Sequence, residues 1–169
     1  MSLYHATIPV FRQMLGALSA IMDKAAAHAE AKKIDPSVFT SGRLAPDMLP
    51  FTRQIFIATD FAKGASARLC GIEVPKYEDT ETTFAELKAR IRKTLDFLGT
   101  LKQAQFDGAE TRDVTIPLRG EQTTFKGRAY LFHFALPNFY FHTTTAYDIL
   151  RHMGVEIGKP DFIHQLIKE

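Results

Sequence analysis

The sequence has almost no cysteine. Cys70 is the single cysteine among 169 residues, so the chain can form neither an internal disulfide nor a zinc site made of several thiolates. This scarcity is typical of a protein from a reducing compartment. The N-terminal stretch MSLYHATIPVFRQ also lacks the basic region and the continuous apolar run of a secretory signal peptide. We therefore expect a cytoplasmic protein.

Long apolar runs and clustered charge are missing as well. No segment approaches the roughly 18 continuous apolar residues of a membrane span, so no membrane partner is expected. Lysine and arginine number 21 against 19 acidic residues, a net charge of +2. These basic residues are spread along the chain, whereas nucleic-acid binding needs a concentrated positive surface. The short basic run at residues 90–93 falls in a helical pattern and is predicted to be a solvated helix face.

Known catalytic and nucleotide-binding motifs are also absent. The sequence contains no G-x-S-x-G, no P-loop and no G-x-G-x-x-G. What is present is the composition of an ordinary globular protein, 46% hydrophobic and 24% charged, with 14 phenylalanines and no tryptophan. This length and composition predict a single domain over residues 1–169 with a phenylalanine-rich core.

Four long stretches have apolar residues at the three- and four-residue spacing of a helix packed on a core. They cover about residues 2–32, 50–70, 83–105 and 128–152. Pro50 is predicted at the first position of the second helix. Thr83 and Glu86 have the form of a capping box at the start of the third.

Between residues 111 and 127 the apolar pattern changes to the alternation of β-strands, with a turn at Gly120. Pro117 argues against a central strand, because proline cannot donate a ladder hydrogen bond. We therefore predict an all-α protein, a four-helix bundle with a short β-hairpin insertion between the third and fourth helices. After Gly154 the chain is expected to run back along the bundle, with the apolar residues at 155, 157 and 162 docked.

The fourth helical stretch carries a polar pair. In a regular α-helix, Asn138 and His142 would lie in the middle of the apolar stripe. Polar groups buried there need hydrogen-bond partners, because each unpaired group costs about 1–3 kcal/mol. Pro137 supplies no N–H and crowds the carbonyl of His133, which can loosen the helix. The pair is therefore either a hydrogen-bonded part of the core or the remnant of a ligand or metal site.

Three segments carry a resemblance that covers nearly the whole chain: MSLYHATIPVF, MLPFTRQIFIATDFAKGA and LPNFYFHTTTAYDILRHMGVEIGKPDF. They resemble an uncharacterised bacterial family within the DinB/YfiT-like metalloenzyme superfamily. The resemblance implies a four-helix bundle with a pocket between helices, and a homodimer, since many members form dimers. In metal-binding members one His comes from the second helix and an H-x-x-x-H pair from the fourth. Some members catalyse thiol-dependent isomerisation or transfer.

Carried onto this sequence, the H-x-x-x-H pair falls on Asn138 and His142, so only the second His is kept. Gln54 and Asp60 are the polar candidates on the second helix, and their angular separation prevents both from facing one site. Gln54 is assigned to the pocket. Asp60, three residues before Lys63, is interpreted as an ion-pair residue and kept as the second choice because a carboxylate is the better metal ligand.

Two amides and one imidazole are a weak ligand set for zinc or nickel, which prefer imidazole, thiolate or carboxylate. We therefore expect no cofactor, and a divalent metal held by His142, Asn138 and Gln54 or Asp60 is the less favoured alternative. The preferred function is binding of a small polar ligand by a degenerate metal site, since amides both donate and accept hydrogen bonds. His142 is the best catalytic candidate.

Two other functions remain open. The first is a metal-dependent transferase or isomerase acting on small-molecule thiol adducts. The second is a non-catalytic structural or interaction module. No sequence feature identifies a substrate.

Overall fold

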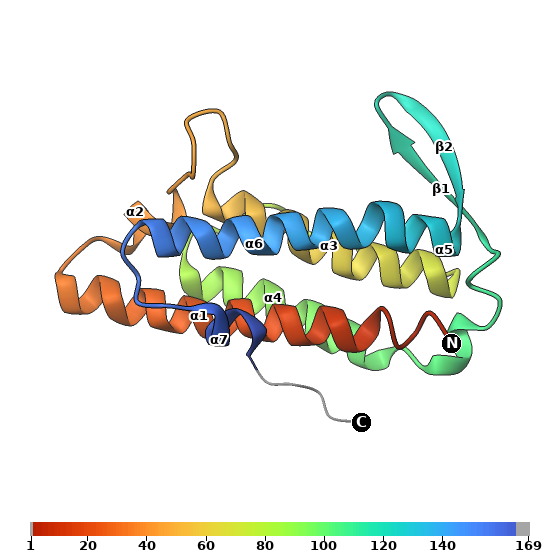
Figure 1. Cartoon of the computed structure of the whole chain (residues 1–169), viewed down its shortest axis with the longest axis horizontal. Helices are drawn as coiled ribbons and strands as arrows, with labels where there is room; N and C mark the ends of the chain where they lie inside the picture. Colours follow the sequence, from red (N-terminus) through yellow and green to blue (C-terminus); the bar gives the residue numbers. More distant parts are fainter. Residues whose placement is uncertain (1, 165–169) are drawn as a thin grey trace.

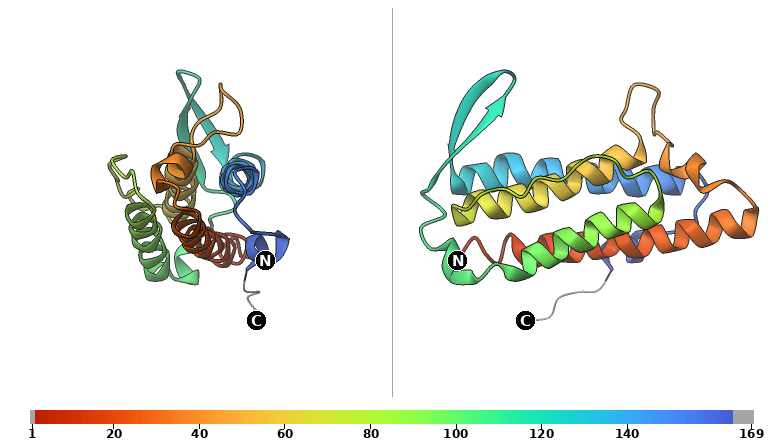
Figure 2. Two further views of the ribbon diagram at one scale, coloured as in Figure 1. Left: turned by 90° about the vertical axis from the view of Figure 1, so that its left-hand side faces the viewer. Right: turned by 180° about the vertical axis from the view of Figure 1, so that it is seen from behind.

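The chain is mostly helical, with one two-stranded antiparallel sheet, in a computed structural model that describes residues 2–164 (Figure 1). The elements in chain order are α1 (Ile8–Lys32), α2 (Pro36–Thr40), α3 (Phe51–Cys70), α4 (Phe84–Thr100), the 3-10 helix η1 (Gln103–Phe106), β1 (Asp113–Leu118), β2 (Glu121–Lys126), α5 (Gly127–Tyr130), the π-helix η2 (Leu131–Ala135), α6 (Leu136–His152) and α7 (Lys159–Ile163). Helices α1, α3, α4 and α6 run side by side, and the hairpin projects from one side of them (Figure 2). None of the described helices is both long and apolar enough to cross a membrane.

The helix ends follow local sequence signals. The Thr83 hydroxyl accepts a hydrogen bond from the Glu86 N–H, and the Glu86 carboxylate accepts one from the Thr83 N–H, which confirms the capping box. Pro50 is the N-cap of α3, one position before the predicted one. Helix α4 ends at Thr100 rather than near residue 105, because the chain leaves the α conformation at Leu101 and continues as η1.

The core is formed by apolar side chains from the long helices. The rings of Phe11 and Phe139 meet edge to face with centroids 4.6 Å apart, which joins α1 to α6. Each such large side chain contributes about 1.5–3 kcal/mol when fully buried. The largest buried side chains include Phe11, Leu18, Ile55, Leu87 and Phe139.

Arg90 is buried, so the prediction of a solvated basic face is wrong for this residue, although Arg92 and Lys93 are exposed. Its guanidinium lies 4.6 Å from the centroid of the Phe56 ring and donates to the Thr59 hydroxyl at 2.8 Å. Three carboxylates neutralise the charge: Asp60 at 3.1 Å, Asp79 at 3.1 Å and Glu81 at 3.2 Å. Two of these come from the irregular segment 71–82, which covers this face of α4.

The predicted hairpin is present. Its two-residue turn, Arg119-Gly120, has positive φ at both positions (52° and 89°), as a type I′ turn requires. On β1, Val114 and Ile116 are buried, whereas Thr115 between them is exposed. Pro117 is tolerated because both strands of a two-stranded sheet are edge strands.

Gly127 lets the chain return from the hairpin to the helices. Its N–H donates to the Arg112 carbonyl at 2.8 Å. A Cβ at this position would lie 2.0 Å from the carbonyl oxygen of Ala109, so a larger residue would push the backbone apart. This close approach fixes the position of the start of α5, and therefore the position of Tyr130 at its end.

The fourth helical stretch is not one regular α-helix, because residues 131–135 form a π-helix. The N–H of Leu136 donates five residues back to the Leu131 carbonyl, just before Pro137, which has no N–H of its own. A π turn holds more residues than an α turn, so the following residues are rotated about the helix axis. The buried line of α6 runs through Phe139, Thr143, Ala146 and Leu150, and residues 138 and 142 are half-buried beside it.

The prediction that Asn138 and His142 occupy the middle of the apolar stripe is therefore wrong. It assumed a uniform rotation of about 100° per residue from residue 131 onward. The π-helix over residues 131–135 has a smaller rotation per residue, so the assumption fails for the residues that follow it.

The C-terminal segment runs back along the helices, as predicted. Val155 and Ile157 are buried, and Phe162 packs edge to face on Tyr147 with centroids 5.6 Å apart. Helix α7 is held on α1 by an ion pair between Lys24 and Asp161 at 2.7 Å.

Candidate functional site

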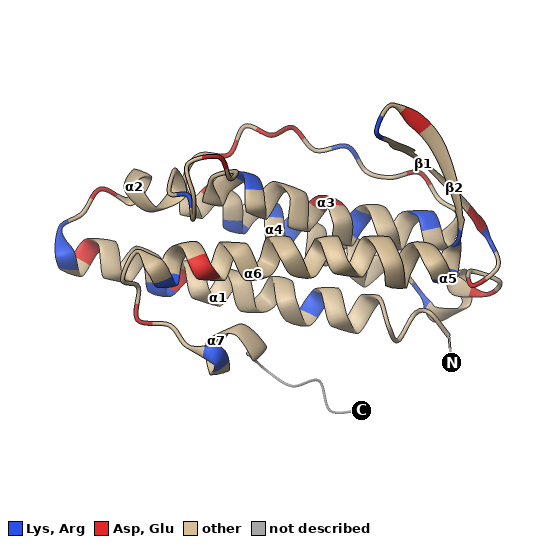
Figure 3. Ribbon diagram, turned by 45° about the horizontal axis from the view of Figure 1, so that its top comes forward, with Lys and Arg blue, Asp and Glu red and all other residues tan. Residues whose placement is uncertain are grey.

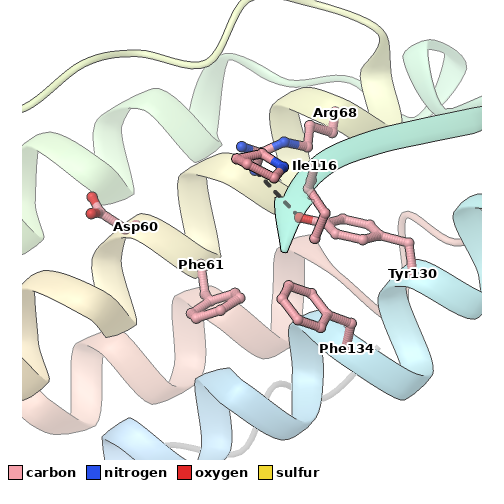
Figure 4. Close-up of a pocket in the computed structure, with 7 residues that line it drawn as sticks. Asp60, Phe61, Arg68, Ile116, Tyr130 and Phe134 are labelled. Carbon is pink, nitrogen blue, oxygen red and sulfur yellow. Dashed lines mark hydrogen bonds between the residues drawn. The ribbon is translucent and has the colours of Figure 1, made fainter. Parts of the chain in front are cut away.

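A cavity of about 250 Å³ lies between α3, the hairpin and the start of the fourth helical stretch (Figure 4). Helix α3 places three side chains on it, strand β1 two, and α5 with η2 two. The lining residues are Asp60, Phe61, Arg68, Ile116, Pro117, Tyr130 and Phe134.

The walls of the cavity are mainly aromatic. Phe61 and Phe134 meet edge to face with ring centroids 5.7 Å apart, and the Tyr130 ring stacks on Phe134 at 6.0 Å. Phe125 from β2 stacks on Phe134 at 5.9 Å. The hairpin is therefore packed on the same rings that line the cavity, which gives this part of the wall a fixed shape.

The polar end of the cavity is formed by Arg68 and Tyr130. The Arg68 Nη1 atom donates a hydrogen bond to the Tyr130 hydroxyl oxygen at 3.3 Å. Burial raises the pKa of Tyr130, and the Arg68 charge lowers it by a smaller amount. The phenol therefore stays protonated at neutral pH and remains a hydrogen-bond donor.

The sequence analysis did not identify Arg68 or Tyr130 as site residues. Phe61 and Arg68 are seven residues apart, a spacing that puts them on one face of a helix. That spacing was the available signal. It could not show that Tyr130 and a hairpin would face them.

Gln54 and His142, two of the predicted site residues, are brought together. The His142 Nδ1 atom lies 2.7 Å from the Gln54 Oε1 atom, and the Gln54 amide nitrogen donates to the Leu49 carbonyl at 2.9 Å. The Gln54 oxygen is an acceptor, so Nδ1 carries the hydrogen and Nε2 is left as an acceptor. Burial lowers the pKa of His142 and favours this neutral form.

Phe61 connects this pair to the cavity. Its ring stacks on the His142 imidazole with centroids 6.3 Å apart and an interplanar angle of 17°. Phe61 lines the cavity, whereas His142 and Gln54 are not among the lining residues. The imidazole therefore supports a wall of the cavity.

The other two predicted residues have different surroundings. The Asn138 amide nitrogen donates to the Phe134 carbonyl of its own helix at 2.7 Å. Asp60 lines the cavity, but its carboxylate also pairs with Lys63 at 2.9 Å and with Arg90 at 3.1 Å. In Figure 4 that carboxylate points away from the aromatic rings.

The donor set does not suit a tightly bound metal. Within residues 2–164, no three or more His, Cys, Asp and Glu side chains come together as a metal site. The Gln54 oxygen faces the hydrogen-bearing nitrogen of His142, and the Asn138 amide is engaged with its own backbone. Two engaged amides and one imidazole offer a poor set for zinc or nickel.

Comparison with known proteins gives the family. The family model described as "Domain of unknown function (DUF1993)" matches residues 3–163. No curated protein matches the chain. A crystal structure of a DinB family member protein from Shewanella denitrificans matches with a TM-score of 0.93 and 44% sequence identity, over 99% of this chain and 94% of that chain. The chain therefore belongs to the DUF1993 family of unknown function, and its structure is DinB-like.

Proposed function

We propose that the protein is a single-domain, DinB-like four-helix bundle that binds a small molecule in the cavity beneath its hairpin insertion. The observation that carries this proposal is the cavity itself, whose aromatic walls end at a guanidinium and a phenol. Ligand sites typically combine apolar walls with a few polar groups that orient the ligand. We therefore propose a pocket beneath the hairpin in place of the one expected from the sequence at Gln54, Asn138 and His142.

The volume of the cavity indicates how much of a ligand it can surround. An enclosed apolar cavity of about 150 Å³ accommodates benzene. This cavity of about 250 Å³ is open on one side and has room for one ring and a short polar substituent. We propose a ligand with a ring of that size bound inside it.

Binding is favoured over catalysis by the position of His142. A general base has to come within hydrogen-bond reach of the proton that it removes. The Phe61 ring, which stacks on His142, lines the cavity in its place. The proposal accordingly requires neither a metal nor an acid–base step.

A library of neutral and charged one-ring compounds, screened by ligand-observed NMR, tests this function. We expect several members to bind the native protein and to lose binding in Ile116→Trp, which fills the cavity from β1. Thr115→Trp is the matched control, because adjacent residues of a strand face opposite sides and Thr115 is exposed. Absence of any binder, or equal loss in both variants, would contradict the proposal.

We also propose that the protein forms a homodimer through an exposed aromatic face, defined by Phe132, Tyr140 and Phe141. No Lys, Arg, Asp or Glu occurs between Arg128 and Asp148, and α6 is almost uncharged along its length (Figure 3). A two-fold axis places the same patch of both subunits against each other. An uncharged aromatic patch meets its copy without like-charge repulsion, which makes a second copy of this chain the best-suited partner.

A further inference from the structure

We infer that the ligand of this cavity carries a carboxylate, which binds between Arg68 and Tyr130; this inference rests on the proposed function. Within residues 2–164, Arg68 forms no ion pair with a carboxylate, and Tyr130 is its hydrogen-bond partner. A guanidinium has five N–H donors and no acceptor. Apart from the bond to Tyr130, its donors have no acceptor among the described residues.

The Tyr130 hydroxyl adds a second donor at the same point. Its oxygen already accepts a hydrogen bond from Arg68, so its hydrogen has to point elsewhere. No described residue accepts that hydrogen, although Tyr130 is only 1% exposed. The remaining Arg68 donors and the Tyr130 hydroxyl hydrogen therefore lie close together, with no acceptor for them among the described residues. The complementary ligand group is an acceptor, and next to a guanidinium it is best an anion.

Asp60 at the other side of the cavity does not oppose this orientation. The Arg68 guanidinium folds back over Gly64, one helical turn after Asp60. The Asp60 carboxylate points away from the aromatic rings in Figure 4. Asp60 itself is already balanced by Lys63 and Arg90 and needs no cation from the ligand.

The middle of the cavity defines the rest of the ligand. Phe61 and Phe134 from two helices and Ile116 from the hairpin border it, and all three lie around one space in Figure 4. A planar ring packs well against aromatic side chains. A planar carboxylate also matches the fork of a guanidinium. The ligand class is therefore a one-ring aromatic monocarboxylate.

Benzoate and benzamide are suitable probes, because they have nearly the same shape and differ in charge. We expect calorimetry or NMR titration of the native protein to show about tenfold tighter binding of benzoate, the usual size of a charge-assisted hydrogen bond. Arg68→Met keeps the aliphatic stem and should remove this preference, and Tyr130→Phe should reduce it. Arg92→Met, on the exposed face of α4, should leave it unchanged.

The outcomes separate the two proposals. Equal affinity for benzoate and benzamide would overturn the carboxylate inference and leave the cavity proposal standing. Binding of other one-ring compounds, but of neither probe, would also overturn it. Absence of binding by every compound tested would overturn both. The comparison of the two probes on the native protein requires no variant, so it holds even if Arg68→Met folds poorly.

Discussion

The imidazole Nδ1 atom of His142 lies 2.7 Å from the amide oxygen of Gln54. This contact joins α3 to α6 across the position where the resemblance implies metal ligands. It also fixes the neutral tautomer of the imidazole, because an amide oxygen can only accept a hydrogen bond. The pair is therefore a hydrogen-bonded polar contact between two helices, and its properties can be tested separately from those of the cavity.

The pH dependence of stability is one such property. The pKa of His142 is lowered from 6.5 by burial. The unfolded chain therefore takes up a proton on this residue at higher pH than the folded chain does, so its contribution to stability is complete above about pH 6.5 and is lost as the pH falls below that value. We expect urea denaturation to show a smaller loss of stability between about pH 7.5 and about pH 5.5 in His142→Leu than in the native protein.

The control for this experiment is His152→Leu, which replaces an exposed histidine of the same helix and should retain the native pH dependence. An NMR titration of the native protein gives an independent check. A titration midpoint for His142 at or above 6.5 would contradict the prediction.

Metal binding should be absent in the native protein and recoverable by substitution. The double variant Gln54→His, Asn138→His replaces two engaged amides by imidazoles next to His142, which produces a three-histidine set. We expect about one equivalent of zinc in this variant and far less in native protein purified without a histidine tag. Stoichiometric metal in native protein that disappears in His142→Ala would contradict the prediction that the site at Gln54, Asn138 and His142 is a degenerate metal site.

Arg90 should be a major determinant of stability. Its guanidinium is fully buried, so Arg90→Met removes the partner of three carboxylates and the anchor of the segment 71–82. Those carboxylates are partly exposed and can hydrate, so we expect a loss of about 2–3 kcal/mol, at or below the lower end for broken buried pairs. Arg92→Met, which removes only an exposed pair with Asp96, should cost less than about 0.5 kcal/mol in urea denaturation. Equal effects of the two substitutions would show that burial of Arg90 is unimportant.

The oligomeric state depends on the exposed aromatic face. Light scattering at micromolar concentration should give the mass of a dimer for the native protein. Phe141→Glu should give a monomer, because it would place two like charges close together across the two-fold axis. Glu121→Gln, a charge change on the hairpin, is the control and should remain dimeric. A monomeric native protein would contradict the proposed interface.

Local features of the fold were predictable because their causes lie within a few residues. The Thr83–Glu86 capping box and the Gly120 turn depend on backbone and side-chain chemistry at short range, and the structure contains both. The burial of Val155 and Ile157 was predictable from their apolar character alone. Pro137 also predicted a disturbance of the helix. The sequence did not predict that this disturbance is a π-helix over residues 131–135.

The position of a side chain relative to other helices and segments could not be predicted in this way. Arg90 is an arginine like its exposed neighbour Arg92, and it is buried because helix α3 and the acidic segment 71–82 cover it. The assumption of a uniform α-helix predicted Asn138 on the buried stripe. The π-helix rotates it to the side of that stripe, where its amide donates a hydrogen bond to the Phe134 carbonyl. Each case depends on a contact or a rotation that single-helix periodicity does not contain.

The sequence by itself determined a mostly helical chain, its capped helix starts and its hairpin. These follow from periodicity, turn chemistry and residue type. Only the tertiary structure decided that Gln54 faces His142, that Arg68 meets Tyr130 and that a cavity opens beneath the hairpin. Those relationships join residues 62 to 88 positions apart, and they arise from the packing of helices and hairpin, which no local pattern specifies.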